Sequence, residues 1–172
     1  MSELRFLTAG ESHGKALTAL VEGIPAGLPL TEDYIAGDLR RRQGGYGRSR
    51  RQQIEEDRAE IVGGVRHGKT LGSPISMLIQ NRVWEDWREV MAVEPYEGDP
   101  KKVTRLRPGH ADLAGTMKYG FDDVRNILER SSARETAARV AVGAVCRRFL
   151  EEFGMAVHSH SVSIGDVFAR PD

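Results

Sequence analysis

Residues 132–149, SARETAARVAVGAVCRRF, form the stretch with the clearest pattern in the sequence. Alanine and valine recur through it at helical spacing, which predicts a helix with one buried face. Ser132 and Glu135 match a capping box, in which the serine oxygen accepts a hydrogen bond from the first turn and the glutamate reaches back. Gly154 is expected to end the helix, because glycine commonly follows a helix C-terminus.

Shorter elements are expected on both sides of this helix. A polar turn, Gly10-Glu11-Ser12-His13-Gly14, separates two apolar runs and predicts a hairpin with functional side chains at its tip. Thr31 is placed to cap a second helix, and Gly44-Gly45 to stop it. Strands and helices mix without strict alternation, so we predict an α+β fold and a single domain over residues 1–172. We expect strands at 4–9, 16–21, 59–65, 74–79 and 156–167, and helices at 31–43 and 111–119.

The composition narrows the class of protein. The chain has 172 residues, 40% hydrophobic and 29% charged, and no apolar run near the roughly 20 residues of a membrane helix. The first residues do not resemble a secretory leader. Cys146 is the single cysteine, so an internal disulfide is excluded. We expect the protein to be located in a reducing cytoplasm. His158 and His160 lack a nearby third ligand, so we predict no metal site.

Arginine dominates the positive charge. Lys+Arg and Asp+Glu are both 25, yet only five of the cations are lysine. Six arginines fall within residues 40–51, and no acid lies between Asp38 and Glu55. Because guanidinium groups grip phosphate and carboxylate bidentately, this patch favours a specific small anion. A solvated surface and an RNA-binding segment are the alternatives, but a neutral chain argues against nucleic acid.

Three segments carry groups suited to chemistry. His13 lies between glycines that let a ligand approach closely, and His110 lies in the loop 107–112; either histidine can transfer a proton near neutral pH. Residues 130–134 (Arg-Ser-Ser-Ala-Arg) precede the long helix, where backbone amides and the helix dipole favour an anion. The alternatives are surface-turn histidines and arginines that only solvate a helix end.

These segments, in this order, resemble the chorismate synthase family. The similarity covers essentially the whole chain and corresponds to the family's amino-terminal half. It is carried by residues 10–14 with 21–25 (VEGIP), by 38–48 (DLRRRQGGYGR), by 107–112 (RPGHAD) and by 130–136 (RSSARET).

The resemblance implies a reaction and its cofactor. The family is a carbon–oxygen lyase of aromatic amino-acid biosynthesis that converts 5-enolpyruvylshikimate 3-phosphate to chorismate and phosphate. It uses reduced FMN without net redox change, and NADPH reduces the flavin in some members. The resemblance further implies a homotetramer whose helices are sandwiched between mainly antiparallel sheets.

The same resemblance assigns roles to residues of this chain. His13 matches the histidine that protonates the leaving phosphate, and His110 the one beside the flavin; Ser12 and Ser132 match a proton relay. The substrate arginines correspond to Arg42, Arg48, Arg51, Arg107 and Arg134. The flavin segment corresponds to Arg130, Ser131, Ser132 and Ala133, and the NADPH positions to Arg42 and Arg48.

The chain is shorter than members of this family. The family's carboxy-terminal half supplies more flavin contacts, another substrate arginine and an aspartate near the flavin. We therefore expect the isolated chain to be weakly active or inactive. The first alternative is a non-catalytic fragment that binds flavin or anions. An RNA-binding domain is the second and less favoured alternative.

Overall fold

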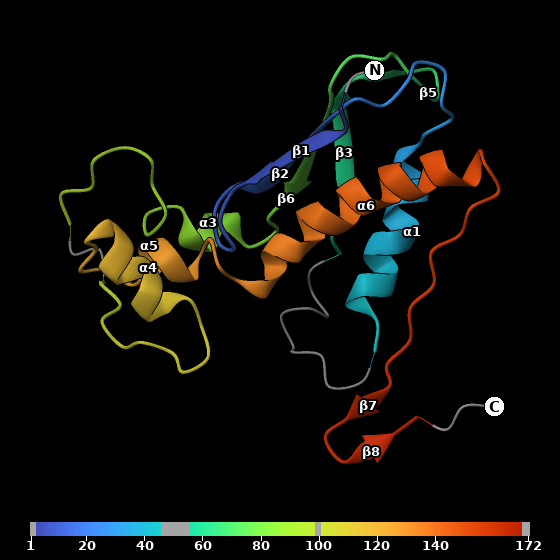
Figure 1. The fold of residues 1–172 in the computed structure, drawn as a ribbon. Coiled ribbons are helices and arrows are strands. Elements are labelled where there is room, and N and C mark those ends of the chain that lie inside the picture. The colour runs from blue at the N-terminus through green and yellow to red at the C-terminus, as the bar shows by residue number, and fades with distance from the viewer. Residues whose placement is uncertain (1–2, 46–55, 99–100, 170–172) are drawn as a thin grey trace.

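The core of the chain is a four-stranded antiparallel sheet. The computed structural model describes residues 3–45, 56–98 and 101–169 (Figure 1). Two of the strands form a hairpin and the other two come from a later segment, so the sheet joins parts of the chain that are distant in sequence. In spatial order the strands are β1 (Arg5–Ala9), β2 (Ala16–Glu22), β6 (Ile75–Gln80) and β3 (Ala59–Gly63).

Two helices, α1 (Glu32–Gln43) and α6 (Thr136–Glu151), pack together on one face of this sheet (Figure 1). Along β2, Leu17, Ala19 and Val21 are buried while the alternating residues are more exposed, which is the period of a strand with one covered face. The core residues of α6 are small, all alanine or valine, and this helix contacts β2, whereas α1 contributes the larger Ile35 and Leu39. The α+β class predicted from the sequence is confirmed.

Three short helices lie together at one end of the sheet, on the left of Figure 1. Their bounds are α3 (Trp84–Trp87), α4 (Asp112–Tyr119) and α5 (Arg125–Leu128). The sequence pattern predicted only α4, because four-residue helices are too short to show a 3.6-residue period. The tip of the β1–β2 hairpin extends toward this group of helices (Figure 1).

Gly10 permits the sharp turn at the start of that tip. Its φ of +97° is in the left-handed region, and a Cβ atom there would lie 2.4 Å from the carbonyl oxygen of Ala16. A side chain is therefore excluded by backbone conformation and by space together. The predicted hairpin is confirmed, with β1 and β2 pairing in register from Arg5–Glu22 to Ala9–Thr18.

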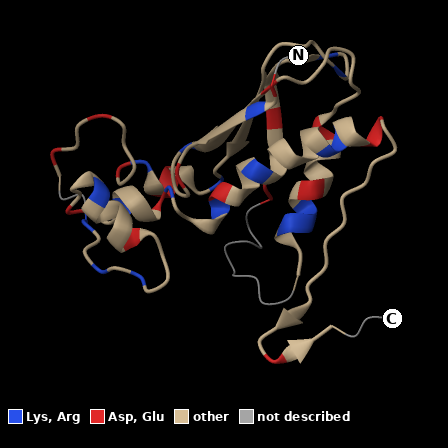
Figure 2. Ribbon diagram, in the orientation of Figure 1, with Lys and Arg blue, Asp and Glu red and all other residues tan. Residues whose placement is uncertain are grey.

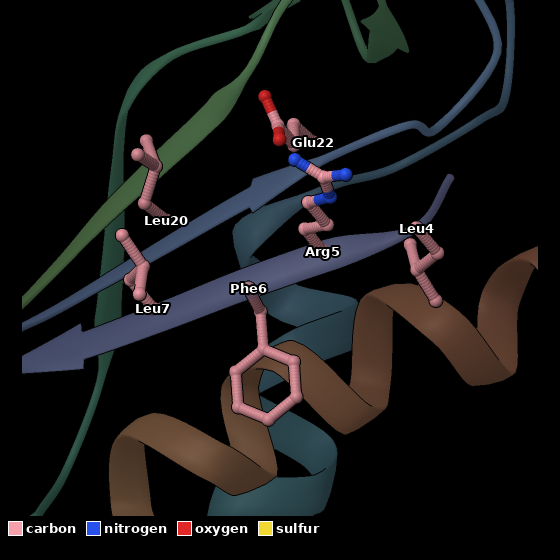
Figure 3. A pocket seen from close by; sticks show the side chains of 6 residues that line it. All are labelled: Leu4, Arg5, Phe6, Leu7, Leu20 and Glu22. Carbon is pink, nitrogen blue, oxygen red and sulfur yellow. The ribbon is translucent and has the colours of Figure 1, made fainter. Parts of the chain in front are cut away.

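The edge strand β1 leaves apolar side chains exposed. Figure 3 shows Leu4 and Phe6 pointing to the side on which α6 lies, while Arg5 and Leu7 point to the opposite side. Leu7 is 72% exposed. A hollow of about 540 Å³ lies along this strand, and none of the predicted site residues lines it.

The helix predictions hold with two corrections. Thr31 caps α1 by accepting the backbone N–H of Tyr34, as predicted. Ser132 does cap the turn that leads into α6, but the capping box is wrong. Residues Ala133–Glu135 form a 3₁₀ turn, and Glu135 bonds to Thr8 and Arg139 rather than reaching back. The second correction is that α6 itself begins at Thr136; it ends at Glu151, and Gly154 follows with a φ of +67°.

The strand predicted at 156–167 is wrong. The segment is irregular up to residue 162, and only a small hairpin, β7 (Ser163–Ile164) with β8 (Val167–Phe168), follows. Every residue from 151 to 169 is exposed, so this segment has no neighbouring strand in the described structure to pair with. The strand predicted at 59–65 is interrupted at Gly64, and β4 (Val65–Arg66) pairs instead with β5 (Lys69–Thr70). No helix in the described ranges is long and apolar enough to cross a membrane.

Candidate active site

The hairpin tip is fixed by Glu129, which directly follows the last residue of α5. The backbone N–H of Ser12 donates to the carbonyl oxygen of Glu129 at 3.0 Å, and the backbone N–H of His13 donates to its carboxylate at 3.0 Å. The His13 ring nitrogen Nδ1 lies 2.8 and 3.0 Å from the two carboxylate oxygens. Glu129 therefore holds both the backbone and the ring of the tip.

An aromatic ring and a cation complete this arrangement. The His13 ring stacks on Trp87, with ring centroids 3.7 Å apart and planes at 27°. The Arg125 guanidinium lies 5.4 Å from the centroid of Trp87 and 3.3 Å from the Glu129 carboxylate. The side chains of His13 and Glu129 are 18% and 1% exposed, so their ion pair is largely shielded from water.

The Glu129 carboxyl stays ionised in this setting. Burial alone would raise its pKa, but hydrogen bonds and charge from His13, assisted by Arg125, outweigh the burial and lower the pKa below its usual value. An ionised carboxylate next to Nδ1 accepts its hydrogen bond and so orients the imidazole ring.

The two predicted relay serines meet at this site. The Ser132 hydroxyl donates to the Ser12 hydroxyl at 3.0 Å, so the hairpin tip touches the turn before α6. The amide of Asn81 donates to the carbonyl oxygens of Ser12 and Gly14 and fixes the tip from the opposite side. Ser12 is 2% exposed and Ser132 is half-buried, so the hydroxyl pair lies at the boundary between the interior and the surface.

Two predicted substrate arginines share one buried carboxylate. Asp57 accepts from Arg42 at 3.0 Å and from Arg134 at 3.3 Å, and its side chain is 1% exposed. Arg42 also donates to Thr136 and to the Ala133 carbonyl, while Arg134 donates to the Ser12 and Gln80 carbonyls. Among the described residues, two guanidinium groups therefore face one carboxylate beside the serine pair.

The predicted flavin segment is anchored to the edge strand β1. Arg130 donates to the carbonyl and hydroxyl oxygens of Thr8, both at 2.9 Å, and the Thr8 hydroxyl donates to Glu135 at 2.6 Å. Nη1 of Arg130 is buried, lies 3.5 Å from the Glu135 carboxylate and donates no hydrogen bond within the described residues. Ser131 and Ala133 are exposed in the same turn.

His110 belongs to a second cluster at the start of α4. Its Nδ1 pairs with the Asp112 carboxylate, which also accepts from the backbone N–H, Nε and Nη2 of Arg107. Burial opposes ionisation of Asp112, but the Arg107 and His110 hydrogen bonds lower its pKa to about 2. The cap position of α4 is Ala111, and no side chain caps the helix.

The arginines at the end of α1 differ in their surroundings. Arg40, Arg41 and Arg42 occupy the last turn of α1 as predicted, visible as the blue end of that helix in Figure 2. Arg42 turns toward α6, whereas the neighbouring Arg40 and Arg41 are exposed. Arg48 and Arg51, also predicted to bind ligand, lie outside the described residues.

Sequence reasoning missed the acids and the aromatic ring that support these groups. Glu129, Asp57 and Trp87 lie in segments without a recognised motif, and their partners are distant along the chain: Glu129 and His13 are 116 residues apart. For Asp57, one signal was present, since an acid that follows an arginine-rich segment is a candidate partner for it.

The arrangement can bind an anion and deliver a proton to it. A histidine held by a carboxylate can serve as an acid, two hydrogen-bonded hydroxyls can pass a proton, and arginines attract phosphate or carboxylate. These groups gather where the hairpin tip, the end of α1 and the turn before α6 meet.

Comparisons with known proteins identify the family of this chain. A sequence model of the family described as chorismate synthase matches residues 4–171. The chorismate synthase of Aquifex aeolicus (strain VF5) is 66% identical over 164 residues, which cover 94% of this chain and 41% of that protein. The chorismate synthase of Geobacillus thermodenitrificans (strain NG80-2) is 60% identical over 170 residues, covering 97% of this chain and 44% of that protein.

The fold agrees as well. A chain in a solved structure titled "Crystal Structure of Chorismate Synthase" superposes with a TM-score of 0.65 at 54% identity, covering 89% of this chain and 35% of the other. This chain spans less than half the length of the curated relatives it matches. The family match over residues 4–171 establishes that the chain belongs to the chorismate synthase family.

Proposed function

We propose that this chain carries the amino-terminal part of a chorismate synthase active site. The reaction of such an enzyme converts 5-enolpyruvylshikimate 3-phosphate to chorismate and phosphate. The observation that carries the proposal is the meeting of His13, the Ser12–Ser132 hydroxyl pair and Arg42 with Arg134 around one point of the fold. This combination matches a substrate with a phosphate and two carboxylates, since each anionic group needs a cationic or donating partner.

In this proposal His13 transfers the proton. As imidazolium it protonates the phosphate oxygen as the carbon–oxygen bond breaks, which makes the phosphate a better leaving group. Arg42 and Arg134 hold the substrate anions, and Arg107, Arg48 and Arg51 are proposed to add to this set. Ser12 and Ser132 pass protons through their hydrogen-bonded hydroxyls.

The residues of the flavin segment fit an anionic cofactor. The buried Nη1 of Arg130 and the exposed Ser131 lie in the turn before α6 with Ser132 and Ala133, where backbone N–H groups favour a phosphate. Reduced FMN held by these residues would supply the electron density that assists departure of the phosphate, without net redox change. His110, held by Asp112, is proposed to set protonation near the flavin.

The remaining features of the proposal come from the resemblance and the composition. A homotetramer, NADPH bound by Arg42 and Arg48 as the flavin reductant, a cytoplasmic location and a single domain over 1–172 stay predictions. Because the chain spans less than half of its curated relatives, weak activity of the isolated chain also belongs to the proposal.

An anaerobic titration tests the proposal. The purified chain is mixed with FMN and 5-enolpyruvylshikimate 3-phosphate, flavin absorbance is followed, and a reductant is then added while chorismate is measured. We expect the substrate to perturb the flavin spectrum and any chorismate to form slowly. The matched variant His13→Ala is expected to retain the spectral change and lose the product.

Two results would count against it. No spectral change with no product would mean that this chain alone does not form the binding site. Product formation unchanged in His13→Ala would remove the proton-transfer role. A spectral change without product in either protein would favour the alternative, a non-catalytic flavin-binding fragment.

A further inference from the structure

The carboxylate of Glu129 faces hydrogen-bond donors on every side that the described residues show. Its two oxygens accept from the backbone N–H of His13 at 3.0 Å, approach Nδ1 of the His13 ring at 2.8 and 3.0 Å, and lie 3.3 Å from a guanidinium nitrogen of Arg125. The side chain is 1% exposed, so water does not compete for these contacts.

The pairing determines which ring nitrogen of His13 carries the proton in the neutral state. An ionised carboxylate accepts hydrogen bonds and donates none, so Nδ1 must bear the hydrogen that points to Glu129. Proton exchange with a ligand therefore runs through Nε2, on the other side of the ring.

Rotation of the His13 ring is also restricted. Trp87 stacks on one face of the imidazole at a centroid distance of 3.7 Å, and Arg125 covers the indole and contacts the same carboxylate. Rotation of the His13 side chain would break the Nδ1 contact and the stacking together. The ring orientation is thus set by residues of α3 and of the segment at α5, not by the hairpin itself.

We propose that Glu129 is the positioning residue for His13: it holds the ring with Nδ1 protonated and aims Nε2 at the ligand. The identity of the ligand that receives the proton rests on the proposed function. The tautomer and the orientation of the His13 ring do not depend on it. Glu129 acts only through His13 and touches no substrate in this proposal.

Replacement of the charge alone provides the sharpest variant. In Glu129→Gln the amide NH2 group must face either the His13 backbone N–H or the Arg125 guanidinium, because each carboxylate oxygen has a donor opposite it. One donor is then left without an acceptor, and Nδ1 no longer has an ionised partner. Glu129→Asp keeps the charge on a shorter side chain and serves as the rescue variant.

The experiment is long-range ¹H–¹⁵N NMR of ring-labelled histidine in the chain without ligand, at alkaline pH where imidazole is neutral. His13→Gln identifies the His13 signals among the five histidines. We expect the Nδ1–H tautomer to predominate in the wild-type chain. Glu129→Gln is expected to move His13 toward the Nε2–H tautomer that free histidine prefers, and Glu129→Asp to restore Nδ1–H in part.

The matched control is Glu11→Gln, the same chemical change on an exposed glutamate two positions before His13. It is expected to leave the His13 tautomer unchanged. A wild-type His13 in the Nε2–H form overturns the proposal even if the Glu129 variants fail to fold, and so does a Glu129→Gln protein that keeps the wild-type tautomer. If the tautomer shifts as expected while His13→Ala leaves chorismate formation intact, the proposed function fails and the assignment of Glu129 stands.

Discussion

The imidazole of His13 lies against the indole of Trp87, with a centroid separation of 3.7 Å and an interplanar angle of 27°. The two rings come from the β1–β2 hairpin and from α3, which the sequence separates by more than sixty residues. Trp87 can therefore report on the state of the hairpin tip by fluorescence.

The first prediction uses this contact. Trp84→Phe leaves Trp87 as the single tryptophan. Adding His13→Gln is expected to change the emission of Trp87, because the imidazole stacked on the indole is replaced by an amide. Equal emission from the single and the double variant would show that the imidazole does not affect Trp87.

The second prediction concerns the carboxylate shared by Arg42 and Arg134. Asp57→Asn is expected to lower the free energy of unfolding by about 3–5 kcal/mol, because two guanidinium groups lose a buried anionic partner. Asp33→Asn removes the exposed partner of Arg58 and should cost less than about 1 kcal/mol. Urea unfolding of both variants measures the difference, and equal losses would contradict the role of Asp57.

The third prediction follows from the acidity of Asp112. Its pKa is about 2 in the folded chain against an ordinary 3.8, so the unfolded chain binds the proton first as pH falls. The stabilisation is present above about pH 4 and is lost as pH approaches about 2. Asp112→Asn should reduce stability at neutral pH and make it less sensitive to pH in this window. Urea unfolding at a series of pH values tests this; parallel curves for the two proteins would contradict it.

The fourth prediction tests the turn before His13. Gly10→Ala introduces a Cβ 2.4 Å from a backbone oxygen at a φ of +97°, whereas Gly27→Ala adds one at +89° with no atom within 4 Å. Both carry the backbone penalty of about 1 kcal/mol or more, and Gly10→Ala adds the clash. Thermal unfolding should therefore rank Gly10→Ala as clearly less stable. A similar loss in both would mean that the hairpin relaxes to accept the side chain.

The elements that the sequence predicted are those specified by neighbours along the chain. The α6 periodicity, the Thr31 cap and the glycine-bracketed turn at 10–14 depend on residues within a few positions, and the structure contains all three. The capping box failed because Glu135 found better partners in Thr8 and Arg139, a choice that tertiary contact decides.

Parts of the candidate site were predictable and its supporting residues were not. The motif at 107–112 supplied His110 together with its partner Asp112, whereas the motif at 10–14 supplied His13 without its partner Glu129. Glu129 has no local pattern, because its role depends on His13, which is 116 positions away. Asp57 lies only 15 positions from Arg42, but its second partner, Arg134, is 77 positions away. An extended strand at 156–167 was wrong for a related reason: strand formation needs a neighbour, and alternation in the sequence does not supply one.

The contacts between Glu129 and the hairpin tip also determine the order in which parts of the fold form. Strands β1 and β2 pair across a short turn, so their hairpin closes a small loop at low entropic cost. The His13–Glu129 contact closes a loop of over a hundred residues, and Ser12–Ser132 closes one of similar length. During synthesis the tip must therefore wait, exposed, until the segment up to residue 132 has left the ribosome. The β1–β2 hairpin therefore forms early, and the contacts of its tip with Glu129 and Ser132 form late.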